Sequence, residues 1–558
     1  MRLQIVKSKN AASLYVVKST YIDGKRSNKI VEKLGTEQSL RKQLNGEDPY
    51  EWAKKYVEKL NKKEQSQTRE ILIKYIPNKT INPNEQRTFN GGYIFLQKIY
   101  HELGLHKICK TITSKYKFEF NLDSILSRLL YARIIFPASK HATHQLSTQF
   151  IEQPDFELQH IYRGLEVIAK ESDYIQSQLY KNSLQISKRN SGVLYYDCTN
   201  YFFEIEQEEG LKQYGPSKEN RPNPIVQMGL FMDGDGIPLA FSITKGNTNE
   251  QQTLKPLEKK ILSDFEHSKF VVCTDAGLSS AENRQFNNIN GRSFVTTQSI
   301  KKLKKHLKEW ALDPTGWSFE GSNKTYDISE IDESEFYESQ GDNCRDRRFY
   351  KVRWIKENGL EQKLIVTYSI KLKKVNPNDY KRLVKKEHCT KDGELAERNL
   401  YSIDHELITK EESTDGFYAV CTNLEDNAID IIEVTKRRWQ IEECFRIMKS
   451  EFKARPVYLK RDDRILAHFT TCFLSLFIYR LLEKRVNHNL GKDEKFTYHQ
   501  IIDSLRNLNF HKITAEGYIP TYTRTDFTDR LHETFGFRTD YQIVTDKEMR
   551  NILKNTKN

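Results

Sequence analysis

The stretch from Gly192 to Ile205, GVLYYDCTNYFFEI, limits the possible folds of this chain more than any other stretch does. Its β-branched and aromatic residues follow one another almost without interruption, whereas a strand with one solvated face alternates apolar and polar residues. We therefore expect a central strand of a sheet that is covered on both faces. Asp197 interrupts this run. A charge in such a strand is costly to bury unless it is paired or bound to a metal ion, which favours a functional role for this carboxylate.

A second aspartate ends the next strand that we expect in the same sheet. The segment from Lys269 to Gly277, KFVVCTDAG, is a short apolar strand that ends at Asp275 and passes into a turn of small residues, as expected where a ligand approaches the carboxyl end of a strand. Between the two strands, the sequence predicts the hairpin IVQMGLFMDGDGIPLAFSITKGN and a helix over Gln251–Ile261. The order of three antiparallel strands, a crossover helix and a parallel strand predicts the start of a ribonuclease-H-like sheet.

A carboxylate among cations marks the segment from Ile431 to His468. At about 100° per residue, Arg438, Glu442 and Lys449 share one face of a long amphipathic helix. Beside that face runs an apolar stripe that would pack on a core, formed by Ile441, Phe445, Met448 and Phe452. Taken alone, the pattern also fits a solvated helix in which Arg438 and Glu442 form an ordinary i,i+4 pair.

The composition favours an anionic partner. The chain of 558 residues has 89 Lys and Arg against 76 Asp and Glu, a net charge of +13, with a pI near 9.0 and a mean hydropathy of −0.72. These values predict a soluble protein that binds nucleic acid.

The sequence predicts no membrane association and a cytoplasmic location. The longest apolar run, Phe469 to Leu482, is too short to span a bilayer and is typical of a buried helix. The N-terminus, MRLQIVKSKN, lacks the apolar stretch of a signal peptide. The eight cysteines occur singly without a CxxC pair, which argues against a zinc ribbon or a disulfide scaffold.

The patterning divides the chain into several parts. An apolar and polar alternation predicts an N-terminal β-meander, and helical periodicity predicts helices over Gly91–Cys109, with a break at Gly104, and over Leu122–Ile135, which we expect to be amphipathic. The expected parts are a β-meander with a charged helix (1–80), a helical module that either binds DNA or supports the core (84–190), the first part of the ribonuclease-H-like core (191–312), a β-rich insertion (313–412), the second part of the core (413–485) and a basic C-terminal region without a catalytic pattern (486–558).

The three carboxylates suit a hard divalent cation. Asp197, Asp275 and Glu442 provide oxygen ligands of the kind that Mg²⁺ and Mn²⁺ prefer, and bound ions remove the repulsion among clustered carboxylates. Two such ions can activate an attacking water or 3′-hydroxyl and stabilise the leaving oxygen of a phosphodiester displacement. Arg438 and Lys449 would then hold DNA phosphates.

Three segments, YYDCTN, VVCTDAG and RRWQIEECFRIMK, resemble the acidic motifs of DDE transposases from bacterial insertion sequences, in the group with the signature Y-x2-R-x3-E-x6-K. Asp197 and Asp275 match the two aspartates of these motifs. Arg438, Glu442 and Lys449 match the R, E and K of the signature, and Thr435 stands at the position of its tyrosine. The segments GPSK before the hairpin and GNTNE after it add to the resemblance, which covers roughly residues 91–482.

The resemblance implies a metal-dependent transposase with two bound Mg²⁺ or Mn²⁺ ions. Its partners would be the terminal inverted repeats of the element and the target DNA, and it would form a homodimer on DNA in the bacterial nucleoid. Two alternatives remain at this point. One is a transposase-derived protein that only binds DNA. The other is a haloacid-dehalogenase-like phosphatase, in which the VLYYDCT strand would carry an aspartyl nucleophile; that class needs a second acid two residues on, where Thr199 stands.

Overall fold

The computed structural model of the protein describes residues 1–7, 12–22, 25–44, 47–67, 71, 73, 76–289, 291–331, 347–369, 384–389, 395–403 and 413–558. The chain forms two compact units, an N-terminal unit (Met1–Glu85) and a main unit (Gln86–Asn558), which we describe separately.

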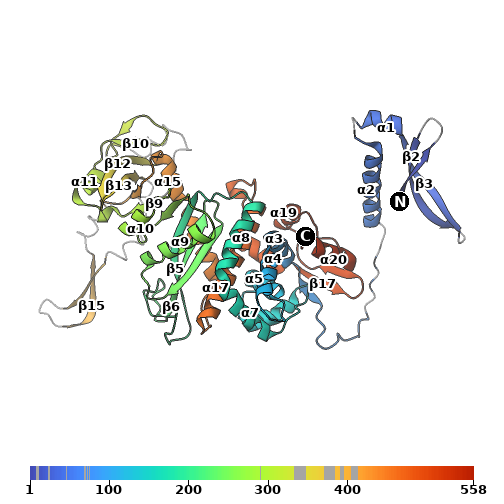
Figure 1. Ribbon diagram of the computed structural model, residues 1–558, viewed down its shortest axis with the longest axis horizontal. Coiled ribbons are helices and arrows are strands. Elements are labelled where there is room, and N and C mark those ends of the chain that lie inside the picture. Colours follow the sequence, from blue (N-terminus) through green and yellow to red (C-terminus); the bar gives the residue numbers. More distant parts are fainter. Residues whose placement is uncertain are drawn as a thin grey trace. The chain divides into compact units, whose positions relative to one another are not determined.

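The N-terminal unit contains the expected meander and charged helix (Figure 1). Its three-stranded antiparallel sheet has the order β1-β2-β3, and Leu14 of this sheet packs with Leu40 and Ala53 of two helices in a small core. The elements are β1 (Arg2–Lys7), β2 (Ala12–Ile22), β3 (Lys25–Thr36), α1 (Glu37–Gln43) and α2 (Pro49–Gln67). The connection between β2 and β3 lies outside the described residues.

A ten-stranded mixed sheet forms the centre of the main unit. The strand from the long apolar run, β5, pairs in antiparallel fashion with β6 and in parallel with β8, and the side chains of Leu194, Tyr195 and Tyr196 are buried on its two faces. The order β7-β6-β5-β8 confirms the predicted hairpin and the parallel strand reached through a crossover helix. These elements are β5 (Val193–Phe202), β6 (Ile225–Asp233), β7 (Pro238–Lys245), α9 (Leu254–Asp264) and β8 (Val271–Thr274).

The strand-rich segment after residue 312 extends this sheet. Beyond β8 the order continues β9-β16-β13-β12-β10-β11. The strands β12 and β13, from the segment expected to be a β-rich insertion, therefore join the sheet through β16. These strands are β9 (Ser293–Gln298), β10 (Trp317–Phe319), β11 (Thr325–Tyr326), β12 (Phe349–Glu357), β13 (Leu360–Tyr368) and β16 (Phe417–Thr422). A separate hairpin pairs β14 (Val384–Cys389) with β15 (Leu395–Ile403), and the short helices α10 (Ala281–Phe286) and α11 (Lys305–Leu312) flank β9 in the chain.

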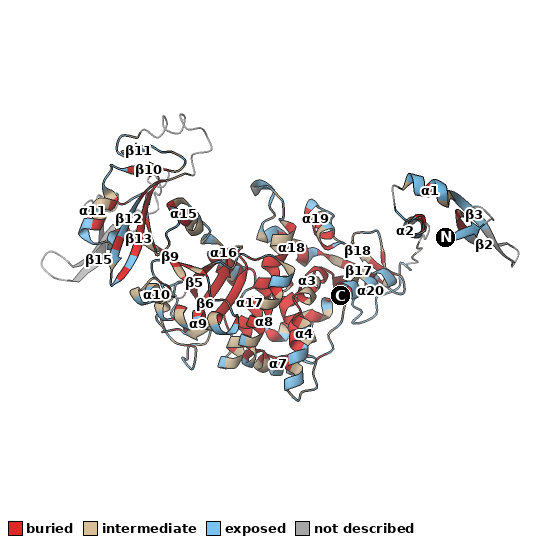
Figure 2. Ribbon diagram, turned by 45° about the horizontal axis from the view of Figure 1, so that its top comes forward, coloured by how far each residue is buried: buried red, intermediate tan, exposed pale blue. Residues whose placement is uncertain are grey.

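A long buried helix, α17 (Asp462–Val486), joins the sheet to the helical module (Figure 2). It is long and apolar enough to cross a membrane, but 94% of its apolar window is buried inside the molecule, as in a core helix. The helices of the module are α3 (Tyr93–Glu102), α4 (Leu105–Lys115), α5 (Leu122–Ile135), α6 (Lys140–Leu146), α7 (Leu158–Lys170) and α8 (Ser172–Ile186). The predicted break at Gly104 is present, in a left-handed conformation with φ of 67°.

Two expectations about helices were wrong. The helix α5 is buried on all sides rather than amphipathic, because α3, α4, α7 and α17 all pack against it. The long helix expected from Ile431 is divided into α15 (Ala428–Lys436) and α16 (Trp439–Ser450). The peptide N–H groups of Arg437 and Arg438 bond to carbonyls three residues earlier, which turns the axis between the two helices.

The C-terminal region contains a sheet that the sequence did not indicate. Its strands β17, β18 and β19 pair in order, and β17 also pairs with β4 (Thr88–Asn90), which lies about 420 residues earlier in the chain, as the Asn90–Asn509 pair shows. The elements are α18 (Tyr498–Asn507), β17 (Asn509–Ile513), β18 (Gly517–Pro520), α19 (Asp526–Phe535), β19 (Val544–Thr545) and α20 (Asp546–Asn555). This region shares the large core with the helical module.

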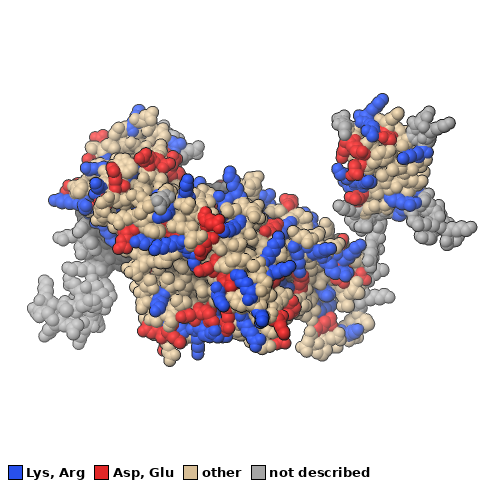
Figure 3. Space-filling view, in the orientation of Figure 1, with Lys and Arg blue, Asp and Glu red and all other residues tan. Residues whose placement is uncertain are grey.

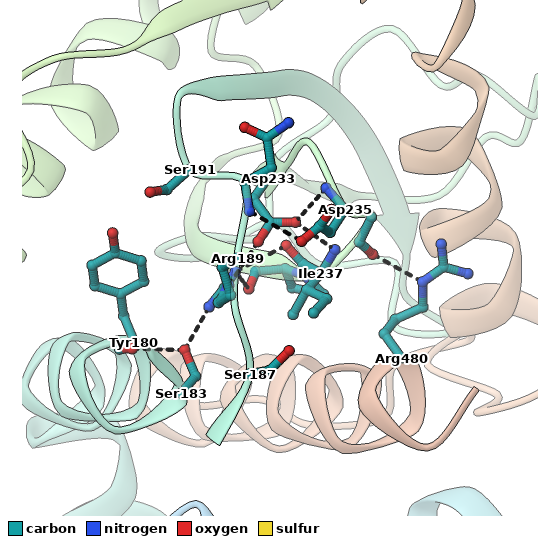
Figure 4. Close-up of polar contacts among 12 residues, drawn as sticks. Tyr180, Ser183, Ser187, Arg189, Ser191, Asp233, Asp235, Ile237 and Arg480 are labelled. Carbon is teal, nitrogen blue, oxygen red and sulfur yellow. Dashed lines mark hydrogen bonds and ion pairs between the residues drawn. The ribbon is translucent and has the colours of Figure 1, made fainter. Parts of the chain in front are cut away.

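A buried ion pair holds the β6–β7 turn against the helices (Figure 4). Arg189 donates to the Asp233 carboxylate over 2.6 Å, and neither side chain is exposed to solvent. The other Asp233 oxygen accepts the N–H groups of Asp235 and Ile237, while Arg480 of α17 donates to the carbonyl of Gly236. The predicted 233–236 turn is therefore held in place by both α17 and the segment that leads into β5.

Candidate active site

Asp197 of β5 and Asp275, which directly follows the neighbouring parallel strand β8, lie close together. In the β5–β8 ladder each residue pairs with the one 78 positions later, as in Val193–Val271 and Tyr195–Cys273. The same offset brings Asp275, the first residue after β8, level with Asp197. Adjacent strands lie about 4.8 Å apart, so these two carboxylates belong to one small site.

Burial in the sheet makes the Asp197 carboxylate unusual. Loss of solvent raises its pKa from 3.8 to about 6, and the negative charge of Asp275 adds to this shift. Lys218, the N–H of Cys198 and Arg438 oppose it because they favour the ionised form. A carboxylate that burial and a like charge both destabilise gains from any cation that approaches it.

The Asp275 side chain is fixed by the turn that follows β8. One carboxylate oxygen accepts the N–H of Leu278 over 3.0 Å, and the carbonyl of Asp275 accepts the hydroxyl of Thr296 over 3.3 Å. Leu278 is buried, while Ala276 and Gly277 between them are exposed. The turn therefore positions the carboxylate and leaves the approach from solvent free of large side chains.

The helices α15 and α16 lie over the face of β5 that carries Asp197. The hydroxyl of Tyr195 donates to the carbonyl of Val434 over 2.7 Å, and the hydroxyl of Tyr201 contacts the sulfur of Met448 at 3.8 Å. Alternate residues of a strand share one face, so Asp197 points toward the same pair of helices. The predicted apolar stripe of α16 is confirmed, since Ile441, Phe445, Met448 and Phe452 are all buried.

Glu442 lies on α16 beside this face, and its carboxylate faces Arg438. The two side chains are 3.2 Å apart, and half of the Glu442 side chain is exposed. Arg438 also favours the ionised form of Asp197, so its guanidinium stands within electrostatic reach of both acids. Among the residues that the structure describes, no three His, Cys, Asp or Glu side chains are arranged to hold a metal ion. The structure thus brings together Asp197 and Asp275 and leaves Glu442 paired with Arg438.

Three cations, Lys218, Arg438 and Lys449, lie near Asp197. Lys449 is 15% exposed, and its pKa is lowered to about 8 by burial and by the nearby Lys218, while Asp197 opposes the shift. The ammonium of Lys449 lies 5.4 Å from the centre of the Tyr201 ring and 3.4 Å from the carboxylate of Glu219. Lys449 and Arg438, which the sequence placed on one helix face, therefore both lie within electrostatic reach of Asp197.

Sequence reasoning did not identify Lys218 and Glu250 as site residues, although it singled out their segments. Lys218 is the last residue of GPSK and Glu250 the last of GNTNE, and the two form an ion pair of 3.1 Å. The ammonium of Lys218 also donates to the carbonyl of Cys198 beside Asp197. Glu219, which pairs with Lys449 and Arg455, carried no sequence signal.

An open cavity of about 640 Å³ adjoins the site between α15 and the sheet. Arg438 and Ala276 form its border toward the aspartates, and Lys301, Arg348 and Lys436 add positive charge to its wall. Thr435 also lines this cavity, and its hydroxyl donates to the carbonyl of Ile432. On the face of the main unit shown in Figure 3, Lys and Arg are interspersed with Asp and Glu. The cavity therefore combines positive charge with direct access to the paired aspartates.

Part of the chain matches a model of a known protein family. Residues 202–478 match a family model described as the transposase DDE domain, a range that includes Asp275 and Glu442 and begins five residues after Asp197. No curated protein matches the sequence significantly. Among solved structures, the chain is similar to the piggyBac transposase in a cryo-EM structure of its synaptic complex with hairpin DNA. The identity is 8% and the TM-score 0.37, over 83% of this chain and 85% of that chain. Just under half of the chain, residues 202–478, is therefore similar to the transposase DDE domain.

Proposed function

We propose that the chain is the transposase of an insertion sequence. It cleaves DNA at the terminal inverted repeats of its element and transfers the ends to target DNA, on a ribonuclease-H-like core and as a homodimer on DNA. The observation that carries the proposal is the placement of Asp275 beside Asp197 among nearby cations. Asp275 lies inside the range 202–478 that matches the transposase DDE domain, and Asp197 lies five residues before it.

In this proposal Asp197, Asp275 and Glu442 hold divalent cations. The donor set fits such ions, because the carboxylates supply only oxygen atoms and because burial and mutual repulsion leave Asp197 short of positive charge. When bound, two Mg²⁺ or Mn²⁺ ions would supply an activated oxygen nucleophile and charge stabilisation for a phosphodiester displacement.

Glu442 joins the other two acids by exchanging its partner. Its present partner is Arg438, at 3.2 Å, and an exposed ion pair of this kind contributes at most about 1 kcal/mol. The cost of releasing the carboxylate toward a cation is therefore small. Once released, Arg438 is free to bind a DNA phosphate with a planar, two-pronged donor set.

Lys449 and Arg438 position the DNA in this proposal. Both are placed to favour an anion beside Asp197, and the adjoining basic cavity continues this surface away from the aspartates. Phosphates held by these side chains would bring the scissile bond to the carboxylates. They would also reduce the repulsion among the positively charged lysine and arginine side chains.

The test uses purified full-length protein, Mg²⁺ and a DNA duplex that carries the inverted repeats flanking its gene. We expect cleavage at the repeat ends that leaves 3′-hydroxyl groups, and no cleavage when EDTA replaces Mg²⁺. Binding of this duplex without cleavage in any divalent metal would favour the alternative of a transposase-derived protein that only binds DNA. Release of phosphate from a small phosphoester, with no action on the duplex, would favour a phosphatase.

A further inference from the structure

The turn that follows Asp275 is held by two side-chain amides from outside the turn. The peptide N–H of Leu278 donates to the Asp275 carboxylate, as described above. The carbonyl of Leu278 in turn accepts the side-chain amide of Asn283 over 2.8 Å. The carbonyl of Gly277 accepts the side-chain amide of Gln251 over 3.0 Å. Gly277 is exposed and has no side chain to pack, so hydrogen bonds rather than packing hold this part of the turn.

The same two residues connect the turn to the segment that carries Glu250. The Asn283 side chain belongs to α10 and is buried, and its amide donates a second hydrogen bond, over 3.0 Å, to the backbone carbonyl of Gln251. Gln251 is the middle residue of a 3₁₀ turn over Glu250–Gln252. The side chains of Gln251 and Asn283 thus form a clamp, which bonds the turn after β8 to the 3₁₀ turn.

The 3₁₀ turn is fixed to β5 at the two neighbours of Asp197. The hydroxyl of Thr253 donates to the carbonyl of Glu250 over 2.6 Å. The same hydroxyl lies 2.7 Å from the hydroxyl of Tyr196 and 3.1 Å from the sulfur of Cys198. A continuous set of contacts therefore runs from the turn after β8, through the clamp, to the part of β5 that carries Asp197.

The helix that supplies Asn283 is fixed at both of its ends. At its start, the hydroxyl of Ser280 accepts the peptide N–H of Asn283 over 3.2 Å. At its end, the side-chain amide of Asn287 donates to the carboxylate of Glu258 on α9 over 3.1 Å, and both of these side chains are buried. The Asn283 amide is therefore held in place before any ligand binds.

We propose that Gln251 and Asn283 are positioning residues that set the separation of the Asp197 and Asp275 carboxylates, and with it the affinity of this pair for divalent cations. The inference rests on the proposed function, because it concerns the same candidate metal site. Hydrogen bonds behind the ligands of a metal ion fix their orientation, and loss of such a bond typically weakens metal binding about 10–100-fold. Both residues act through the backbone of the turn and are therefore not catalytic residues.

The test measures binding of Mg²⁺ to the full-length protein by isothermal titration calorimetry. Gln251→Ala removes the hydrogen bond to Gly277, and Asn283→Ala removes the other two bonds of the clamp. We expect both variants to bind Mg²⁺ about 10–100-fold more weakly than the wild type. The control is Gln285→Ala, which removes an exposed amide of the same helix that donates to the carbonyl of Asn358. This control keeps the wild-type affinity.

Cleavage of the inverted-repeat duplex separates a positioning role from a merely structural one. In Gln251→Ala we expect the half-saturating Mg²⁺ concentration to rise by the same factor as the dissociation constant, while the rate at saturating Mg²⁺ stays close to that of the wild type. Binding of the duplex in EDTA stays unchanged, because the substitution removes no charge. A merely structural role would instead lower the melting temperature without metal and leave the Mg²⁺ affinity unchanged.

Amide hydrogen exchange over residues 275–280 tests the clamp in the absence of metal. We expect faster exchange of this segment in Gln251→Ala than in the wild type and in Gln285→Ala, because the turn opens more often once a bond is lost. Unchanged exchange would overturn the proposal.

The outcomes distinguish this inference from the proposed function. Wild-type protein that binds Mg²⁺, together with equal affinity in Gln251→Ala, would overturn the inference alone. Wild-type protein that binds no divalent cation would contradict the proposed function and the inference with it. Gln251 is partly exposed, so Gln251→Ala provides the decisive comparison even if the buried change Asn283→Ala prevents folding.

Discussion

Asp275, the first residue after β8, lies beside Asp197 of the neighbouring strand β5, close enough that the charge of Asp275 raises the pKa of Asp197. Both acids follow from local features of the sequence, one within a continuous apolar run and one at the end of a short apolar strand. The strand pairing adds that the two acids are neighbours, because it pairs each residue of β5 with the residue 78 positions later. The predictions below test what this pair and its surroundings do.

Removal of the second aspartate abolishes stabilisation by metal. In Asp275→Asn one carboxylate is lost without a change in shape, so the site lacks one of the charges that would hold Mg²⁺. We expect Mg²⁺ to stabilise the wild type by about 2.7 kcal/mol when its concentration is a hundred times the dissociation constant, and so to raise the melting temperature. We expect the melting temperature of the variant to stay the same when Mg²⁺ is added. Asp264→Asn, an exposed change at the end of α9, serves as the control and keeps the shift. A full Mg²⁺ shift in Asp275→Asn contradicts the assignment.

Loss of Lys449 weakens the engagement of DNA. The side chain lies beside Asp197 and is held by Glu219, so Lys449→Ala removes one phosphate contact from the site. We expect weaker binding of the inverted-repeat duplex and a log affinity that depends on log salt with a slope smaller by about one unit. Arg446→Ala removes one exposed cation from the same helix and provides the control. Equal salt slopes for Lys449→Ala and Arg446→Ala would mean that Lys449 contacts no phosphate and only packs within the protein.

The pH dependence of DNA binding follows from the same lysine. Burial and Lys218 lower the pKa of Lys449 to about 8, so in the free protein this side chain loses its charge as the pH rises through about 8. Its contribution to binding is thus complete well below that pH and declines above it. We expect wild-type affinity to fall more steeply than that of Lys449→Ala between pH 7 and pH 9 in anisotropy titrations. Parallel pH profiles for the two proteins contradict a charged role for Lys449.

The buried ion pair at the β6–β7 turn contributes to stability. Arg189→Gln leaves the Asp233 carboxylate without its partner, and burial already raises the pKa of that acid. We expect the variant to lose about 3–5 kcal/mol of unfolding free energy in urea denaturation at pH 7. The comparison is Lys181→Gln, which breaks the exposed pair with Glu266 at a cost of about 1 kcal/mol or less. Similar losses in both variants would mean that the turn does not depend on the buried pair.

Much of the fold follows from local sequence patterns, because long apolar runs and sharp turn signals specify their own structure. The continuous run around Asp197 indicates a covered strand, the 233–236 turn a hairpin, and Gly104 a helix break, and all three are present. The stripe on α16 is buried as its spacing predicts.

The features that the sequence did not reveal depend on contacts between distant segments. The strand β17 pairs with β4, which lies near the other end of the main unit's sequence. Pairing between such distant segments leaves no periodic signal within the five residues of β17. The break before α16 lies at Arg437 and Arg438, two residues that are compatible with a continuous helix, so packing rather than propensity sets it. Lys218 reaches Asp197 only because the loop after β5 folds back over that strand, as the contact of its ammonium with the Cys198 carbonyl shows.

The central claim is that Asp197 supplies a metal-binding carboxylate for strand cleavage, and one measurement addresses it directly. Wild type and Asp197→Asn are compared for Mg²⁺-dependent cleavage of the inverted-repeat duplex and, in EDTA, for binding to the same duplex. The substitution keeps the shape of the side chain and removes the charge, so we expect cleavage to be lost while binding to DNA stays close to that of the wild type. Cleavage by Asp197→Asn at a rate comparable to that of the wild type would contradict the account.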